Sequence, residues 1–225
     1  MCLHHSAMLT IVLTRHGHTD HSDPDQYTGQ NIEAHLTEAG RAGAMALGER
    51  LAGVSFDRVV SSPLERAVET ARLVEPAAHI ETDDRLKEAA YGDWEGCTIT
   101  EVEERWPKER AIWEADPAAT RMPGGESGDD VARRVRSFLD ELTAWESGRA
   151  NPNDDHRLLV VGHSTLNRVL LAVALEVPLR DFRRRFRQDW VNLTVLRYGP
   201  PGDGPMLLLG NDLAHVNGIR GSTWD

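Results

Sequence analysis

Leu9-Thr-Ile-Val-Leu-Thr-Arg15-His16-Gly17 is an apolar run that ends in a basic residue, a histidine and a glycine. A second run of this kind, Leu158-Leu-Val-Val-Gly162-His163-Ser164, lies in the last third of the chain. Short apolar runs are typical of strands that are buried in a parallel sheet. Groups beyond the carboxyl ends of such strands gather at one edge of the sheet, where helix N-termini also offer N–H donors to an anion. We therefore expect the two histidines to share one pocket.

Between and after these runs, predicted strands alternate with predicted helices. Thr37 is expected to cap a helix whose apolar stripe ends at Leu51, and Thr98-Ile-Thr-Glu101 is a capping-box pattern that starts another, interrupted or restarted at Pro107. Further helices are predicted from Pro63 through Val74, from Ser127 to about Gly148 and over 166–175. Further strands are predicted over 58–62, 191–196 and 206–209. This alternation predicts the α/β class, as a three-layer α/β/α sandwich around a mostly parallel central sheet.

The composition is that of a globular, acidic chain. A length of 225 residues with 40% hydrophobic residues favours one domain over two. The formal net charge of −11 argues against a nucleic acid as the main partner, because affinity for nucleic acids comes chiefly from Lys and Arg.

The only cysteines, Cys2 and Cys97, fit neither a disulfide framework nor a four-ligand zinc site, and agree with a reducing cytoplasm. Residues 1–8 lack the basic start of a signal peptide, and no run approaches the roughly 18 apolar residues of a membrane span. We expect a cytoplasmic protein with neither a membrane nor a nucleic acid as partner.

Five spaced blocks carry a more specific signal. They are Arg15-His16-Gly17-x-Thr19, Ser61-Ser-Pro-Leu-x-Arg66-Ala-x-x-Thr70-Ala71, Leu86-x-Glu88-x-x-Tyr91-Gly-x-Trp94-x-Gly96, Gly124-Gly-Glu-Ser127 and Gly162-His163. In this order the chain resembles the histidine phosphatase superfamily, in its phosphoglycerate-mutase-like branch, over nearly its whole length. The resemblance implies a three-layer α/β/α fold, a nucleophilic histidine, and no metal or other cofactor. We expect a single domain over 1–225, in which a segment of about 97–126 forms a substrate lid.

The resemblance also implies roles for five residues. His16 would become phosphorylated, His163 would steady the phosphoryl oxygens, and Glu88 would serve as general acid and then general base. Arg15 and Arg66 suit the same chemistry, because guanidinium forks bind phosphate oxygens bidentately and spread the charge of the transferring group. Neighbouring cations also disfavour an imidazolium, which would keep His16 neutral and nucleophilic.

Substrate contacts are expected from a second group, namely Thr19, Thr28, Gly29, Tyr91, Ser164 and Thr165. Several alternatives stay open for it. Thr28 and Gly29 could form a simple turn, Tyr91 could pack in the core, and Ser164 and Thr165 could cap the following helix. The basic cluster over 183–187 could be a solvated face, a dimer face or a substrate rim.

Departures from the mutase pattern favour hydrolysis. Cofactor-dependent mutases carry a lysine and an arginine pair where this chain reads Cys97-Thr-Ile-Thr100 and Ala111-Ile-Trp-Glu114. His18 and Ser22 also replace the usual residues beside the phosphate pocket. The predicted activity is a phosphomonoester hydrolase acting on a small phosphorylated metabolite, with a mutase or a non-catalytic phospholigand-binding module as alternatives. A homodimer is an open alternative to a monomer, because relatives are often dimers.

Overall fold

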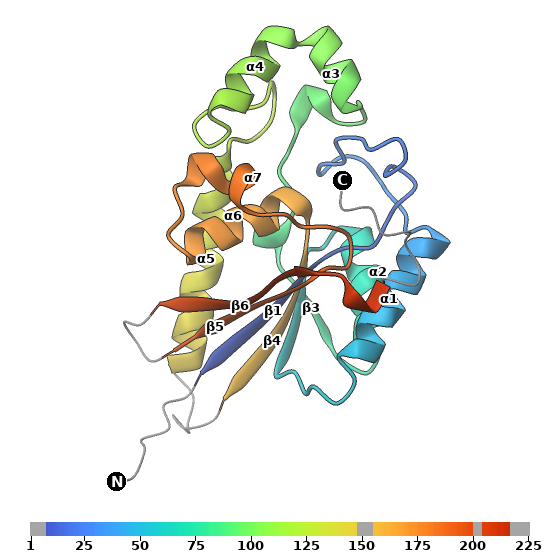
Figure 1. Ribbon diagram of the computed structural model, residues 1–225, viewed down its shortest axis with the longest axis vertical. Coiled ribbons are helices and arrows are strands. Elements are labelled where there is room, and N and C mark those ends of the chain that lie inside the picture. The colour runs from blue at the N-terminus through green and yellow to red at the C-terminus, as the bar shows by residue number, and fades with distance from the viewer. Residues whose placement is uncertain (1–7, 148–154, 200–203, 217–225) are drawn as a thin grey trace.

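The computed structural model describes residues 8–147, 155–199 and 204–216. A six-stranded sheet lies between two layers of helices, as Figure 1 shows. The strands are β1 (Leu9–Arg15), β2 (Arg58–Ser61), β3 (Ile80–Thr82), β4 (His156–Gly162), β5 (Leu193–Tyr198) and β6 (Pro205–Asp212). The helices are α1 (Glu38–Arg50), α2 (Glu65–Val74), α3 (Ile99–Arg105), α4 (Pro107–Ala115), α5 (Gly128–Ser147), α6 (Ser164–Ala174) and α7 (Phe182–Arg185). The predicted three-layer α/β/α fold is confirmed.

The sheet is mostly parallel, as predicted. Its strand order is β3-β2-β4-β1-β5-β6, and β3, β2, β4 and β1 all pair in parallel. The two antiparallel pairs are β5 with β1 and β5 with β6. In the central pair, Arg15 at the end of β1 lies opposite Gly162 at the end of β4. The residues that follow these two strands therefore leave the sheet side by side.

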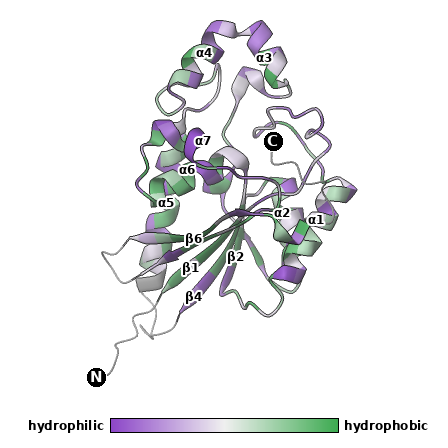
Figure 2. Ribbon diagram, viewed as in Figure 1, coloured by the Kyte–Doolittle hydropathy of each residue, from purple (hydrophilic) through white to green (hydrophobic). Residues whose placement is uncertain are grey.

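Each face of the sheet carries its own hydrophobic core. Ile11 and Leu13 of β1 pack with α5 and α6 on one face, whereas Val12 packs with α1 and α2 on the other. Successive strand residues point to opposite faces, so a strand covered on both sides has apolar residues on both. Figure 2 shows hydrophobic colours along the central strands and hydrophilic colours on α7. This double burial explains why Ile11, Val12 and Leu13 follow one another without a polar residue between them.

A small lobe formed by α3 and α4 stands beyond the end of the sheet at which β1 and β4 finish (Figure 1). The predicted capping box begins α3, because Thr98 accepts from the Glu101 N–H and Glu101 accepts from the Thr98 N–H. Pro107 restarts the chain as the first residue of α4. In the part of the chain that the structure describes, no helix is both long enough and apolar enough to cross a bilayer.

Two of the helices start at residues other than those predicted. Thr37 caps α1 as predicted. The prediction that α2 starts at Pro63 is wrong, because Leu64 is extended and its carbonyl oxygen accepts the first helical N–H groups, so α2 begins at Glu65. Helix α6 begins at Ser164, two residues before the predicted start.

The C-terminal strands also differ from their predicted ranges. Strand β5 starts at Leu193 and not at Val191, because Val191 has a φ of 51°, which no strand residue adopts. Strand β6 extends beyond the predicted 206–209 to Pro205–Asp212. The short β3 and α7 had no periodic signal and were not predicted. The stretch Asn151-Pro-Asn-Asp-Asp155, whose composition predicts a loop, lies mostly outside the described residues.

The loop after β1 packs against α1 without room for a side chain at Gly40. A Cβ atom on Gly40 would overlap the backbone oxygen of His18, and one on Gly17 would lie 2.7 Å from the backbone oxygen of Gly40. The neighbouring atoms are backbone, so they cannot move aside alone. The position of the His16 loop therefore depends on this backbone contact.

We predict that Gly40→Ala lowers the free energy of unfolding by about 1–3 kcal/mol, the usual cost of an atom forced into a packed region. The matched control is Gly210→Ala, whose Cβ would make only an ordinary 3.6 Å contact with Leu207. Urea unfolding of both variants measures the difference. Equal stability of the two variants would contradict the close approach.

Candidate functional site

The two strand-terminal histidines lie together, as expected. The ring centroids of His16 and His163 are 5.1 Å apart, and the N–H of His16 donates to the carbonyl oxygen of Gly162 at 3.0 Å. Both rings are buried. Neither ring nitrogen of His163 has a hydrogen-bond partner among the described residues. The parallel pairing of β1 with β4 thus brings together two imidazoles from opposite ends of the sequence.

His16 is held as a neutral ring with a defined tautomer. Its Nδ1 lies 2.7 Å from the carbonyl oxygen of Gly17, which can only accept, so Nδ1 carries the proton and Nε2 keeps its lone pair. Burial and the charges of Arg66 and Arg15 lower the pKa of His16 well below its ordinary value. The same causes lower the pKa of His163, led by burial. Both rings are therefore neutral at pH 7.

The predicted arginines reach this point from two elements. Arg15 ends β1, lies over the ring of Trp190 at 4.7 Å and donates to the carbonyl oxygen of Gln188 at 3.2 Å. Arg66 of α2 is buried and donates through Nη2 to the carbonyl oxygens of Thr28 at 3.0 Å and Gly29 at 2.8 Å. The Nε atoms of both arginines have no partner among the described residues. Each guanidinium therefore keeps N–H groups for an anion.

A buried network of amide side chains holds the segment around Gln188, whose carbonyl oxygen accepts from Arg15. Asn167 donates to the carbonyl oxygen of Thr14 at 3.1 Å and to Gln188 Oε1 at 3.2 Å. Gln188 donates in turn to Thr194 at 3.0 Å, and Asn192 donates back to Gln188. The network links the ends of β1 and β5 to α6, so it holds the wall on which Arg15 rests.

Glu88 is buried against the start of α6. Its Oε1 accepts from the N–H groups of Ala89 at 2.9 Å and Leu166 at 3.0 Å, and its Oε2 accepts from the Thr165 N–H at 3.1 Å. His163, the N-cap residue of this helix, supplies no side-chain cap. A carboxylate from far along the chain therefore caps α6, which satisfies N–H groups that would otherwise lack partners.

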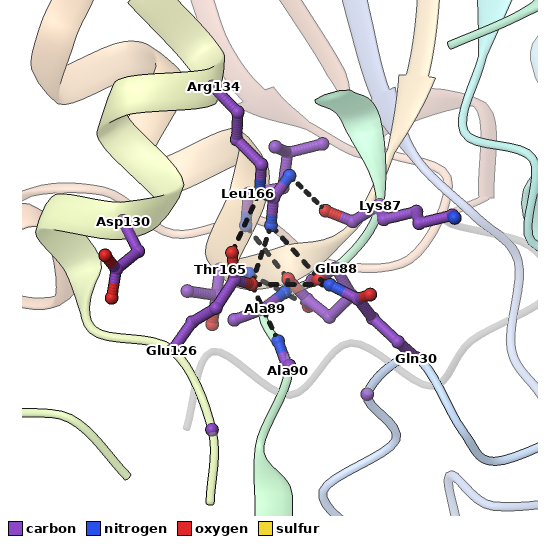
Figure 3. A network of polar contacts seen from close by, with 12 residues as sticks. Gln30, Lys87, Glu88, Ala89, Ala90, Glu126, Asp130, Arg134, Thr165 and Leu166 are labelled. Atoms are coloured by element: carbon purple, nitrogen blue, oxygen red, sulfur yellow. Dashed lines mark hydrogen bonds and ion pairs between the residues drawn. The ribbon is translucent and has the colours of Figure 1, made fainter. Parts of the chain in front are cut away.

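Figure 3 shows the second layer of contacts that holds Glu88. Arg134 of α5 donates to the carbonyl oxygens of Lys87 at 2.6 Å and Glu88 at 3.1 Å, and pairs with Glu126 at 3.2 Å. Gln30 also donates to the carbonyl oxygen of Glu88, at 2.8 Å. The backbone at Glu88 is thus anchored from both sides, and its carboxylate is left directed at α6.

These groups border a cavity of about 680 Å³. Eight of the predicted residues lie on its wall, namely Arg15, His16, Thr19, Thr28, Glu88, Tyr91, Ser164 and Thr165. Arg66, His163 and Gly29 are not on the wall but lie directly behind it, through the contacts described above. The hydroxyl of Tyr91 bonds to that of Thr165 at 2.8 Å.

The two departures from the family pattern have different surroundings. His18 packs edge-on against Trp190 with ring centroids 4.9 Å apart, and its Nδ1 lies 3.0 Å from the Thr37 hydroxyl. Ser22 lies on the cavity wall and accepts from the Thr19 N–H at 3.0 Å. Ser22 therefore braces Thr19, whereas His18 supports the start of α1.

Sequence reasoning missed several wall residues, including His21, Asp25, Arg168 and Trp190. His21, interpreted as an ordinary surface histidine, is half-buried and lies 2.6 Å from Gln26 Oε1. Arg168 could have been found, because it follows Ser164 by four positions on a helix and so shares its face. Within the described ranges, no group of three or more His, Cys, Asp or Glu residues is placed to hold a metal ion.

Comparison with known proteins assigns the family. The model of the histidine phosphatase superfamily, branch 1, matches residues 11–212. This match spans every element from β1 to β6. It therefore includes all five residues whose catalytic roles the resemblance implies.

Three similar proteins agree with this assignment. A bifunctional protein of Mycobacterium tuberculosis is 38% identical over 88% of this chain, which spans about half of that protein, 53%. A glucosyl-3-phosphoglycerate phosphatase of Mycobacterium tuberculosis is 36% identical over 76% of this chain and 78% of its own. The solved structure of a mycobacterial glucosyl-3-phosphoglycerate phosphatase with inorganic phosphate has a TM-score of 0.78 and 32% identity, and the match covers 92% of this chain and 99% of that one. This chain belongs to the histidine phosphatase superfamily, branch 1.

Proposed function

We propose that this chain hydrolyses small phosphate monoesters through a covalent phosphohistidine on His16. One observation carries the proposal: a buried, neutral His16 with its Nδ1 proton bound to Gly17 lies beside two guanidinium groups. This is the state in which an imidazole can attack a phosphorus atom whose oxygens are held by cations. The phosphatase names of similar proteins support the same reaction class.

In the first step, Nε2 of His16 attacks the phosphorus and the ester P–O bond breaks. Arg15 and Arg66 bind the equatorial oxygens, and His163 orients its ring toward the same group. The leaving oxygen departs with the electron pair of the broken bond and takes a proton from Glu88. The products of this step are a free alcohol and a phosphohistidine.

The contacts of Glu88 indicate which of its oxygens carries that proton. Oε1 accepts two N–H bonds, whereas Oε2 accepts only the one from Thr165. Oε2 therefore has the freer lone pair, and we assign the proton to it. In the second step, Glu88 removes a proton from water, the water oxygen attacks the phosphorus, and the P–N bond to His16 breaks to release phosphate.

The proposed reaction draws on residues from the end of β1 to the residue after β4, and we propose one domain over 1–225. We propose that the segment of about 97–126, which contains α3 and α4, acts as a lid, because Ile99 from this segment lies on the cavity wall. A mutase would need phosphoryl exchange between 2- and 3-phosphoglycerate, which is its discriminating assay. The predicted cytoplasmic location, metal independence and homodimer stay predictions.

His16→Ala should abolish turnover and leave the fold intact, because it removes the nucleophile. Retention of more than about a thousandth of wild-type turnover would count against covalent catalysis, since general acid–base groups alone contribute about 10²–10⁴. A wild-type sample quenched at alkaline pH should contain phosphohistidine by mass spectrometry, and the variant should not. His35→Ala, an exposed histidine on the following loop, is the control.

The neutral state of His16 can be tested directly. Because burial and the adjacent arginines hold the pKa of His16 and of His163 well below the ordinary value, neither imidazole should gain a proton between about pH 8 and 5.5. Imidazole nitrogen NMR checks this, with signals assigned by their loss in His16→Ala and His163→Gln. A titration of either signal centred near the ordinary histidine pKa would be incompatible with the proposed nucleophile.

Glu88 and Arg66 should respond differently to the leaving group. Glu88→Gln should slow an alkyl phosphate by roughly tenfold to a hundredfold more than an activated aryl phosphate, because an aryl oxide leaves with little proton donation. Arg66→Ala should slow both alike, since it stabilises the phosphoryl group that is common to them. The ratio of kcat/KM values measures the effect, and Arg72→Ala, an exposed arginine on the same helix, is the control. An unchanged ratio in Glu88→Gln would assign the proton to another residue.

A further inference from the structure

The cavity wall carries more positive charge than one phosphoryl group needs. Besides Arg15, five arginines lie on it, namely Arg168, Arg183, Arg184, Arg185 and Arg187. Among the described residues, the carboxylates on the wall are Asp25, Glu88 and Asp189. Glu88 is occupied by backbone N–H groups, and Asp189 pairs with Arg187 at 2.8 Å. The remaining arginines are therefore incompletely neutralised in a chain whose net charge is −11.

Arg168 is the most confined of these cations. It projects from α6, one turn after Ser164. Its guanidinium makes no hydrogen bond or ion pair with any residue in the described ranges. Burial and the nearby charges of Arg15 and Arg183 lower the pKa of Arg168 to about 10. A confined guanidinium without a partner is costly to keep. Such a guanidinium is suited to binding a ligand anion, which would neutralise its charge.

Arg183 is braced beside it by an aromatic ring. Its guanidinium lies 4.4 Å from the ring centroid of Trp113, a buried residue of α4. Stacking of this kind uses the flat face of the guanidinium and leaves the N–H groups at its edge free to donate. Helix α7, which carries Arg183, is strongly hydrophilic (Figure 2). Arg184 and Arg185 on the same helix are exposed to solvent.

The acidic groups that face Arg168 do not neutralise it. Glu88 acts on it only through its charge at a distance, and Tyr91 stays neutral because burial raises the pKa of its phenol. Asp25 is also within electrostatic reach, but no ion pair joins the two side chains, and burial raises the pKa of Asp25. A ligand anion between Arg168 and Arg183 would therefore meet two guanidinium groups, neither of which is paired with a carboxylate among the described residues, although the hydroxyl of Tyr27 lies beside Arg183.

We propose that Arg168 and Arg183 form a second anion subsite, so that the preferred substrate is a phosphate monoester whose organic part carries a further acidic group. This inference rests on the proposed hydrolysis at His16. The cavity volume of about 680 Å³ leaves room for such a group beside the phosphoryl pocket. Carboxylates and phosphates both bind guanidinium forks bidentately, so the subsite chemistry covers both.

A matched pair of substrates tests the subsite. Glycerol 3-phosphate and 3-phosphoglycerate differ only in that a carboxylate replaces a hydroxymethyl group. Wild-type kcat/KM should favour 3-phosphoglycerate by about tenfold to a hundredfold, the effect of one or two hydrogen bonds to a charged group. Glycerol 1,3-bisphosphate forms the second arm, and whichever acidic compound is preferred identifies the anion as carboxylate or phosphate.

Arg168→Gln and Arg183→Gln should each remove about tenfold of that preference. Arg168→Lys should keep part of it, since the charge stays and the fork is lost. Arg180→Gln, an exposed arginine that is absent from the wall, removes the same charge and should leave the preference unchanged. Thermal unfolding of each variant shows whether it is folded.

Two results would overturn the subsite. One is a wild-type enzyme that hydrolyses an aryl phosphate but shows no preference between the matched compounds. The other is a preference that survives both arginine variants. If no phosphate ester is hydrolysed, the proposed function fails, and calorimetric binding of the matched pair then tests the subsite alone. Equal affinities in wild type, or affinities unaltered in Arg168→Gln, would reject it.

Discussion

The parallel pairing of β1 with β4 is the constraint on which the site depends. It sets Arg15 opposite Gly162, so the chain leaves both strands at the same level and His16 hydrogen-bonds across to the end of β4. Both strands are covered by helices on each face, and a slip of one residue would turn every side chain to the wrong core. The packing of the whole sheet therefore fixes the distance between two imidazoles. The geometry of the proposed catalytic centre therefore depends on the hydrophobic core.

A second dependence joins the proposed acid to the helix that follows β4. Glu88 serves as the cap of α6, and α6 in turn carries Thr165 and Arg168 to the cavity wall. Arg134 of α5, which pairs with Glu126 just before that helix, anchors the backbone at Glu88, so contacts from distant parts of the chain set the position of the carboxylate. In the proposed reaction, the carboxylate that caps and stabilises the helix is also the acid, so the same hydrogen bonds would serve stability and catalysis.

The cavity wall is rich in positive charge, although the chain as a whole is acidic. An acidic molecule places several arginines on the wall of one cavity, and burial strengthens the electrostatic interactions of those that are least exposed, such as Arg15 and Arg168. Burial lowers the pKa of His16, and the same cations that would bind a phosphate lower it further, so these cations contribute both to the proposed substrate affinity and to the state of the nucleophile. Removing a single arginine would therefore affect both. The surrounding negative charge does not prevent this, because charges in the solvent-exposed surface are screened over a short range.

Local patterns were enough to predict the strands at Leu9 and Leu158, the capping box at Thr98 and the placement of His16 and His163 at one edge of the sheet. Hydrophobic period and capping chemistry act between near neighbours, so they are visible in the sequence alone. The sequence could not show that Glu88 caps α6, that Val191 takes a left-handed conformation or that His21 borders the cavity. Those features come from contacts between residues far apart in the chain, and only the packed tertiary structure decides which side chains meet.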